Sequence, residues 1–256
     1  MAMSEDEFTL GAIELLHRFG VRVARVPIEA DAKTPDLRGA GGPDLYAIEL
    51  KQRDSDRVLN ALPEVEPAAL QQLAPFGLTR DRAVQSLIRV GAHQLRRELE
   101  TTLRLIWVHC EGFDSESDQV QVQNSLLGSE YLLDRGEGGR VYLCHFFGES
   151  DFWRYRAELD GAIVSRQVDK HNVNFSFLLN PHSPRLDRLV ASTIATSIGA
   201  KALVNVREEE AAGACLIADC EIARGDSDAV LAYVRNKYGL DLVRVPIHRY
   251  GGVMQW

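Results

Sequence analysis

The sequence predicts an α/β protein, and three observations lead to this prediction. Segments with apolar residues at helical spacing are interleaved with segments that alternate or run continuously apolar, as strands do. Of the 256 residues, 45% are hydrophobic and 26% are charged, which is ordinary for a protein with a packed core. No apolar run approaches the length of a membrane span, so the sequence predicts a cytoplasmic protein with no membrane partner.

The first part of the chain is predicted to be a helix followed by a meander of strands. A stripe of apolar residues at helical spacing predicts the helix, and Gly20 marks its end. Alternating or continuous apolar positions bounded by glycine and proline predict the strands. The expected elements are a helix at 5–19, strands at 21–27, 33–37 and 45–51, and a glycine turn at 39–43.

A longer helical stretch, a buried strand and a polar segment come next. Helical spacing extends over 66–100 with an expected break near 75–77, and residues 103–110 form an apolar strand. The acidic stretch 111–118 has no apolar period, so we expect a core domain at 1–110 and a second α/β region at 111–256. In that region we expect strands at 141–147, 162–166, 173–179, 202–206, 215–218 and 242–246, and helices at 151–158, 184–198 and 226–238.

The charge of the chain limits the class of function. The formal net charge of −8 counts against a protein that simply coats nucleic acid. It does not count against an enzyme that holds a phosphate through a divalent cation, because such a site needs carboxylates.

Cysteines and histidines show no metal-binding spacing. We find neither a CxxC pair nor a Cys and a His at zinc-ligand intervals, and we interpret the cysteines as reduced thiols of the core. A glycine-rich phosphate loop and a GxSxG elbow are also absent. The residues concerned are Cys110, Cys144, Cys215 and Cys220, and His109, His145, His171 and His182.

One set of charged residues has the spacing expected of a catalytic site. Pro35-Asp36 is followed, after twelve intervening residues, by Glu49-Leu50-Lys51. Side chains two apart on a strand share a face, so Glu49 and Lys51 point the same way, and a hairpin brings Asp36 beside them. Glu49 is the only charge between Leu45 and Leu50, and a buried charge is unfavourable without a partner. Two carboxylates that meet in a cleft suit a hard divalent cation such as Mg²⁺.

This pattern resembles that of the PD-(D/E)xK nuclease superfamily, which includes many restriction endonucleases and the archaeal Holliday-junction resolvases. In that family the Asp begins one strand, the acidic residue and the Lys lie on the next, and a helix precedes both. The resemblance covers roughly residues 1–110 and implies a restriction-endonuclease-like core of helix, mixed sheet and helix. It implies that Asp36 and Glu49 bind Mg²⁺ or Mn²⁺ together with the backbone carbonyl of Leu50. Lys51 would orient the attacking water or stabilise charge on the phosphate.

The sequence offers further acidic residues for this site. In the family, an acidic residue from the first helix often completes the site, and Glu7 and Glu14 lie on one flank of the expected helix. We prefer Glu7 as the additional acidic residue, although an exposed, solvated position on the helix would explain either glutamate equally well. Asp44 follows a second proline, but only four residues separate it from Glu49, so we interpret it as a turn residue.

A basic ridge is expected on the helix before residue 100. Arginines recur there every seven residues, which suits contacts to phosphates. A solvated face balanced by neighbouring acidic residues gives the same pattern, so both interpretations stay open. The ridge consists of Arg82, Arg89 and Arg96, with His93 and Arg97 beside them.

The expected function is metal-dependent hydrolysis of phosphodiester bonds in nucleic acid, with DNA as the expected substrate of an endonuclease. Residues 111–256 would serve substrate selection, dimerisation or the binding of a protein partner. Two alternatives remain. The protein could be a non-catalytic relative that binds nucleic acid or a protein partner, or Glu49 and Lys51 could form an ion pair on an exposed edge strand, with Asp36 in a Pro-Asp turn.

Overall fold

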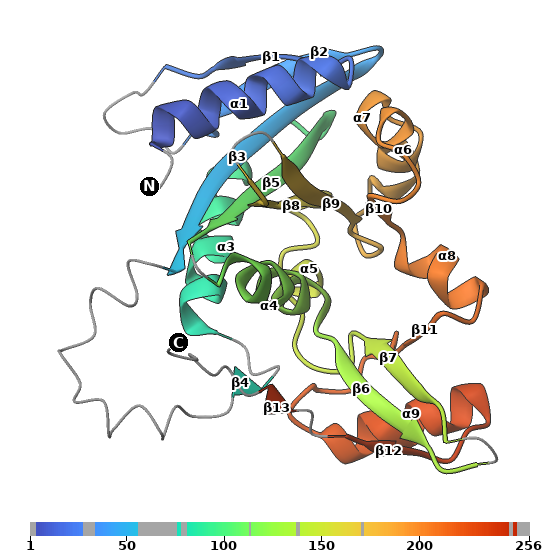
Figure 1. The fold of residues 1–256 in the computed structure, drawn as a ribbon. Helices are drawn as coiled ribbons and strands as arrows, with labels where there is room; N and C mark the ends of the chain where they lie inside the picture. Colours follow the sequence, from blue (N-terminus) through green and yellow to red (C-terminus); the bar gives the residue numbers. More distant parts are fainter. Residues whose placement is uncertain are drawn as a thin grey trace, which may run out of the picture.

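The computed structural model contains a mixed seven-stranded sheet with helices on both faces, and a smaller four-stranded sheet (Figure 1). The strand orders are β1-β2-β3-β5-β8-β9-β10 in the large sheet and β11-β7-β6-β12 in the small one. The predicted α/β class is confirmed. The structure describes residues 4–27, 34–55, 76–77, 81–112, 114–136, 139–169, 172–245 and 248–249.

The N-terminal elements follow the predicted order, with one shift. They are α1 (Glu5–Arg18), β1 (Arg22–Arg25), β2 (Leu37–Gly41) and β3 (Asp44–Asp54). The three strands form an antiparallel meander. The strand expected at 33–37 begins only at Leu37, and the turn expected at 39–43 contracts to Gly42 and Pro43.

Glycine geometry explains this shift. A Cβ on Gly39 would lie 2.1 Å from the carbonyl oxygen of Arg22, so this glycine allows β1 and β2 to approach within the sheet. Gly42 has a φ of +56°, which favours glycine, and it forms the turn itself. Asp44 follows the turn as the first residue of β3, where it is buried and its Oδ1 accepts from Arg188 Nε at 2.9 Å.

The large sheet becomes parallel at its centre. Its remaining strands are β5 (Thr102–Glu111), β8 (Gly161–Gln167), β9 (Val173–Leu179) and β10 (Leu203–Val204). β3 pairs in parallel with β5 and β5 with β8, whereas β9 runs antiparallel to β8 and β10 parallel to β9. Three of the seven strands therefore come from after residue 110, and the division expected there falls within one continuous sheet.

Each face of this sheet has its own hydrophobic core. Helices α3 (Arg82–Leu95) and α4 (Ser115–Leu127) pack on one face, where they meet Ala47 of β3. Helix α1 packs on the other face against Ile48 and Leu50. Because side chains alternate along a strand, Glu49 and Lys51 share the face of Ala47 and lie on the α3 side.

Helix α4 begins in the stretch expected to be a boundary. Its buried positions include the polar residues Asp118, Gln119 and Ser125, so its apolar period is weak. Asp118 Oδ1 accepts from Arg53 Nε of β3 at 2.5 Å, which compensates for burying the carboxylate. Gly128, with a φ of +59°, then ends the helix.

The small sheet lies beyond α4 and is covered by one helix. It contains β6 (Glu130–Asp134), β7 (Val141–His145), β11 (Cys215–Ile217) and β12 (Leu242–Arg244), and α9 (Ser227–Tyr238) covers it. Val230 and Val234 of α9 pack against Leu132, Leu216 and Leu242 of the strands. β6 was not predicted from the sequence.

Short elements complete the described chain. They are α5 (Asp151–Arg154), α6 (Leu186–Val190), α7 (Thr193–Ser197), α8 (Val206–Ala211), β4 (Phe76–Gly77) and β13 (His248–Arg249). The helix expected at 184–198 is divided because Ser192 caps α7, its Oγ accepting from the amide of Ala195. Of the helical stretch expected at 66–100, residues 76–77 form β4 and residues 82–95 form α3, while 66–75 and 78–80 lie outside the described residues.

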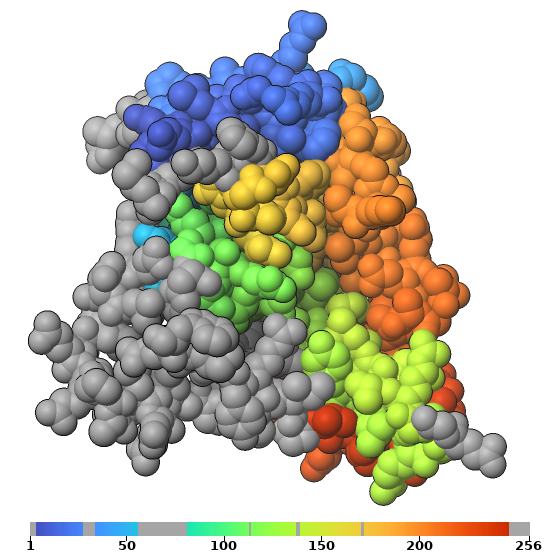
Figure 2. Space-filling model, in the orientation of Figure 1, coloured from blue at the N-terminus to red at the C-terminus, as the bar shows by residue number. Residues whose placement is uncertain are grey.

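The segment from α6 to α8 links the two sheets. It runs along one side of the molecule (orange) from the N-terminal region (blue) to the strands of the small sheet (yellow-green) (Figure 2). None of the helices described combines the length and apolar character needed to cross a membrane.

Candidate functional site

The β2–β3 hairpin brings Asp36, Glu49 and Lys51 together, and we call these three residues the Asp36 group. In the hairpin register the residue after Asp36 pairs with the residue before Glu49, which puts the two acidic residues opposite each other. The amide of Leu50 donates to Asp36 Oδ2 at 2.8 Å, and Lys51 Nζ donates to Glu49 Oε1. Two carboxylates and one ammonium group therefore meet at the central part of the sheet.

Glu49 is the electrostatically unusual member of the Asp36 group. Its side chain is 0% exposed, and its Oε2 has no hydrogen-bond partner among the residues that the structure describes. Burial raises the pKa of Glu49 to about 7; Lys51 opposes this rise, the negative charge of Asp36 adds to it, and the backbone of Asp36 opposes it by hydrogen bonding. A buried carboxylate oxygen without a partner is unfavourable, and a proton or a cation would relieve the cost. The oxygen donors of Asp36 and Glu49 are ligands that Mg²⁺ and Mn²⁺ prefer, so these residues fit a hard divalent ion.

The ion pair between Glu49 and Lys51 is not a surface feature. β3 lies between β2 and β5, so it is not an edge strand. The Lys51 side chain is only 21% exposed, and that of Glu49 is fully buried. The alternative of an exposed ion pair on an edge strand is therefore wrong in its location, although the pair itself is present.

Helix α3 supplies a residue that the sequence did not suggest. Gln94 Oε1 accepts from Lys51 Nζ at 3.2 Å, and its Nε2 donates to the carbonyl oxygen of Thr34 at 3.4 Å. Gln94 thus links Lys51 to the segment just before Asp36. A Cβ on Gly91 would lie 3.3 Å from Glu49 Cγ, so Gly91 allows the helix to approach the site. Gly91 and Gln94 lie three apart on one helix face, a spacing that was visible in the sequence.

The basic ridge does not face the Asp36 group. Because Gly91 and the other buried positions of α3 face the sheet, Arg82, Arg89 and His93 lie on the solvent side of the helix, and Arg96 and Arg97 follow its last residue. Arg96 Nε lies 3.9 Å from Glu158 Oε1, and the ring of His93 packs edge-on to Tyr155. Some of its charge is therefore balanced locally. The exposed residues of the ridge are Arg82, Arg89, His93, Arg96 and Arg97.

Glu7 and Glu14 of α1, the two residues considered for the site, are engaged elsewhere. Helix α1 packs on the sheet face opposite to Glu49. Glu7 accepts from the backbone and hydroxyl of Ser4, and these hydrogen bonds lower the pKa of Glu7. Glu14 accepts from Arg18 Nη2 at 2.6 Å on the helix surface. The structure does not join either residue to the Asp36 group.

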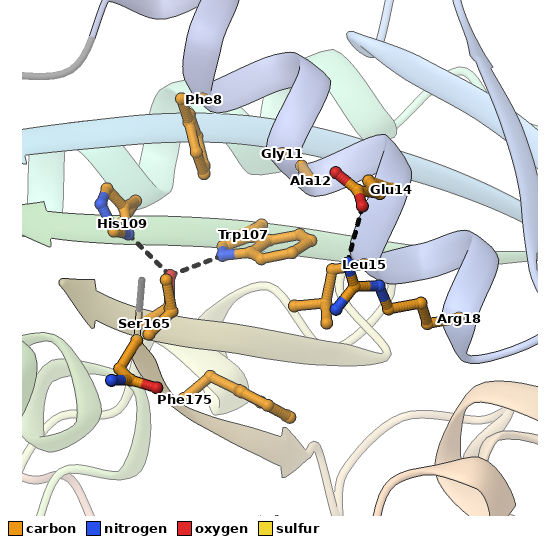
Figure 3. Close-up of a pocket in the computed structure, with 12 residues that line it drawn as sticks. Phe8, Gly11, Ala12, Glu14, Leu15, Arg18, Trp107, His109, Ser165 and Phe175 are labelled. Atoms are coloured by element: carbon orange, nitrogen blue, oxygen red, sulfur yellow. Dashed lines mark hydrogen bonds and ion pairs between the residues drawn. The ribbon is translucent and has the colours of Figure 1, made fainter. Parts of the chain in front are cut away.

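A cavity of about 330 Å³ lies on the α1 side of the sheet, between α1 and strands β5, β8 and β9 (Figure 3). Inside it Ser165 Oγ accepts from Trp107 Nε1 at 2.8 Å and lies 2.9 Å from His109 Nδ1. The ring of Phe8 stacks on His109, and burial lowers the pKa of His109 to about 4. Glu14 lines its rim, but no member of the Asp36 group does. This cavity is therefore separate from the candidate site.

Comparison of the chain with protein-family models, with curated protein sequences and with solved structures finds no match.

Proposed function

We propose that this protein is a metal-dependent nuclease that hydrolyses phosphodiester bonds, with DNA as the expected substrate. The observation that supports the proposal is the convergence of Asp36, Glu49 and Lys51, in which one buried oxygen of Glu49 lacks a partner among the described residues. Paired carboxylates that hold a hard cation, with a nearby cation from the protein, are the groups that metal-assisted phosphodiester hydrolysis uses.

We further propose a restriction-endonuclease-like core made of α1, β1 to β3, β5 and α3. Its order of helix, antiparallel meander, helix and parallel strand supports the resemblance to the PD-(D/E)xK superfamily. In this proposal the core is continuous with β8 to β10 instead of forming a separate domain.

In this proposal each residue of the site has a separate role. Asp36 and Glu49 hold Mg²⁺ or Mn²⁺ through carboxylate oxygens, with the carbonyl of Leu50 as a further ligand. The bound ion would polarise the phosphate and acidify a water molecule. The amide of Leu50 fixes the orientation of the Asp36 carboxylate. Lys51, held by Gln94, keeps a positive charge where negative charge develops on the phosphate.

The proposal predicts cleavage that requires Mg²⁺ or Mn²⁺ and disappears with EDTA. Purified protein is incubated with supercoiled plasmid, linear duplex, single-stranded DNA and RNA, and the products are separated on gels. Glu49→Gln protein purified in parallel controls for contaminating nucleases. Intact substrates under every metal condition, together with retained DNA binding, would support the non-catalytic alternative.

The basic ridge yields a separate prediction about binding. Replacing Arg89 and Arg96 together with glutamine is expected to weaken DNA affinity and to lower the salt slope by about 2, because each lost phosphate contact removes about one released counterion. Fluorescence anisotropy with labelled duplex at several salt concentrations measures both quantities.

The control for this experiment is Arg135→Gln, which removes an exposed arginine that follows β6 and pairs with Asp241. We expect Arg135→Gln to leave the slope unchanged. A parental slope in the Arg89 and Arg96 double variant would assign the ridge to solvated surface.

A further inference from the structure

A second set of polar side chains converges between the small sheet and α8. His145 ends β7, Cys215 begins β11, and Glu209 lies in α8. One donor atom from each of these residues, which we call the His145 cluster, lies within 4.8 Å of the other two. β7 and β11 pair in parallel with Ile217 opposite His145, so Cys215, two residues earlier, shares the face of His145.

The imidazole of His145 is oriented toward this cluster. Its Nδ1 lies 2.8 Å from Ser129 Oγ, which fixes the ring. Its Nε2 is buried, has no hydrogen-bond partner among the described residues, and lies 3.9 Å from Glu209 Oε2. His145 itself is 3% exposed. A buried ring nitrogen without a partner is unfavourable, and this one points at a carboxylate beyond hydrogen-bonding distance, so both groups are able to bind a common ligand.

We propose that His145, Glu209 and Cys215 bind a transition-metal ion, with Zn²⁺ as the expected one. Zn²⁺ takes imidazole, thiolate and carboxylate ligands at about 2.0–2.3 Å, which separates neighbouring donors in a tetrahedral site by roughly 3.3–3.8 Å. The 3.9 Å between His145 and Glu209 is close to that separation. Three protein ligands leave the fourth position to water.

The surroundings suit a cation of this kind. The negative charges of Glu209 and Glu210 act on the sulfur of Cys215, and carboxylates beside a thiol favour a bound cation. The Cys215 thiol donates to the carbonyl oxygen of Val206 at 3.6 Å. Imidazole and thiolate are softer ligands than Mg²⁺ prefers, so the His145 cluster is chemically distinct from the Asp36 group.

A bound ion would connect β7 to two elements, α8 and β11, that follow much later in the sequence. It would join β7 and β11 of the small sheet to α8, and thereby fix the segment that runs from α6 toward that sheet. An ion that binds the folded state but not the unfolded state would stabilise the protein by mass action.

The test uses the full-length protein, freed of metal with EDTA and then dialysed. Co²⁺ is added as a spectroscopic probe, followed by Zn²⁺. We expect a thiolate-to-cobalt charge-transfer band that saturates at one Co²⁺ per chain and disappears when Zn²⁺ displaces that ion; Co²⁺ bound by the oxygen ligands of the Asp36 group contributes no such band. Zn²⁺ should also raise the melting temperature. The absence of a thiolate band in the parent protein would overturn the proposal.

Variants locate the site. Cys215→Ser should lose the band, and His145→Ala should weaken Zn²⁺ affinity by more than about 100-fold, since even substitutions behind a ligand cost about 10–100-fold. Cys220→Ser, which alters a thiol outside the cluster, and Asp36→Asn, which alters the other proposed metal site, should both keep the band. Survival of the band in Cys215→Ser would also overturn the proposal.

Glu209→Gln keeps the test decisive if a buried variant fails to fold. The Glu209 side chain is 39% exposed, so this substitution is expected to leave the metal-free fold intact, as near-ultraviolet circular dichroism would show. Zn²⁺ affinity should fall by about 10-fold or more, because a charged ligand is replaced by a neutral amide. Unchanged affinity in Glu209→Gln would exclude the carboxylate from the site and overturn the proposed ligand set.

Discussion

Replacing Lys51 with alanine is expected to slow the chemical step of cleavage by about 10³-fold while metal affinity stays at or above that of the parent. Removing one group that stabilises the charge of a transition state typically costs about 10²–10³ in rate. Lys51 is not a ligand in our proposal, and it repels a cation, so its loss does not weaken metal binding. Calorimetric metal titration beside single-turnover cleavage measures the two effects separately.

Asp36→Asn is expected to behave in the opposite way. It removes a charged ligand, so metal affinity falls and activity falls with it. High Mn²⁺ should restore part of the lost activity, because Mn²⁺ binds such ligands more tightly than Mg²⁺.

Lys201→Ala, at an exposed lysine elsewhere, is the control for Lys51→Ala, because it also removes one positive charge. Parental cleavage by Lys51→Ala would show that Lys51 has no part in the reaction.

Without metal, Glu49 is expected to lower the free energy of unfolding by about 3 kcal/mol as the pH rises from 4.5 to beyond 7. The unfolded chain releases the Glu49 proton near pH 4.5, whereas burial in the folded state raises the pKa to about 7. Between these values the folded state binds more protons than the unfolded state. The stability that this group contributes is therefore fully present below pH 4.5, decreases as the pH rises, and is lost once the pH passes 7.

Urea unfolding at several pH values in EDTA measures this loss, and Glu49→Gln should remove it. The difference between parent and variant isolates Glu49 from the other titrating groups of the chain. Glu14→Gln, at an exposed glutamate of α1, provides a matched control. Mg²⁺ at pH 8 should stabilise the parent but not Glu49→Gln. Identical pH profiles for the parent and Glu49→Gln would contradict the prediction.

Elements with an uninterrupted period could be predicted well from the sequence. β9 spans the expected residues 173–179, and α9 begins one residue after the expected position. Helix α4 was missed because it buries polar side chains, of which Asp118 is matched by Arg53 from a distant strand. The predicted position of β2 was wrong because Gly39 lies within the strand, where it allows β1 to approach, and not in the turn. Local turn propensity cannot reveal this contact.

The candidate sites show the same distinction between local and long-range information. The spacing of Glu49 and Lys51 on one strand, and the hairpin before them, predict that these residues and Asp36 meet. The contact of Gln94 with Lys51 depends on how α3 packs on the sheet, and no local pattern specifies it. The His145 cluster combines residues from three separate elements, so a search for closely spaced ligands could not find it.

The parallel centre of the large sheet has a consequence for how the chain acquires its structure during synthesis. All ten residues of β5 are buried, and β5 depends on β8 for one of its two neighbouring strands. Until the ribosome has released residues 161–167, one edge of β5 has no partner to satisfy its backbone. The nascent protein must therefore keep its N-terminal half from associating with other chains through this edge, and pairing of strands so distant in sequence makes folding slow.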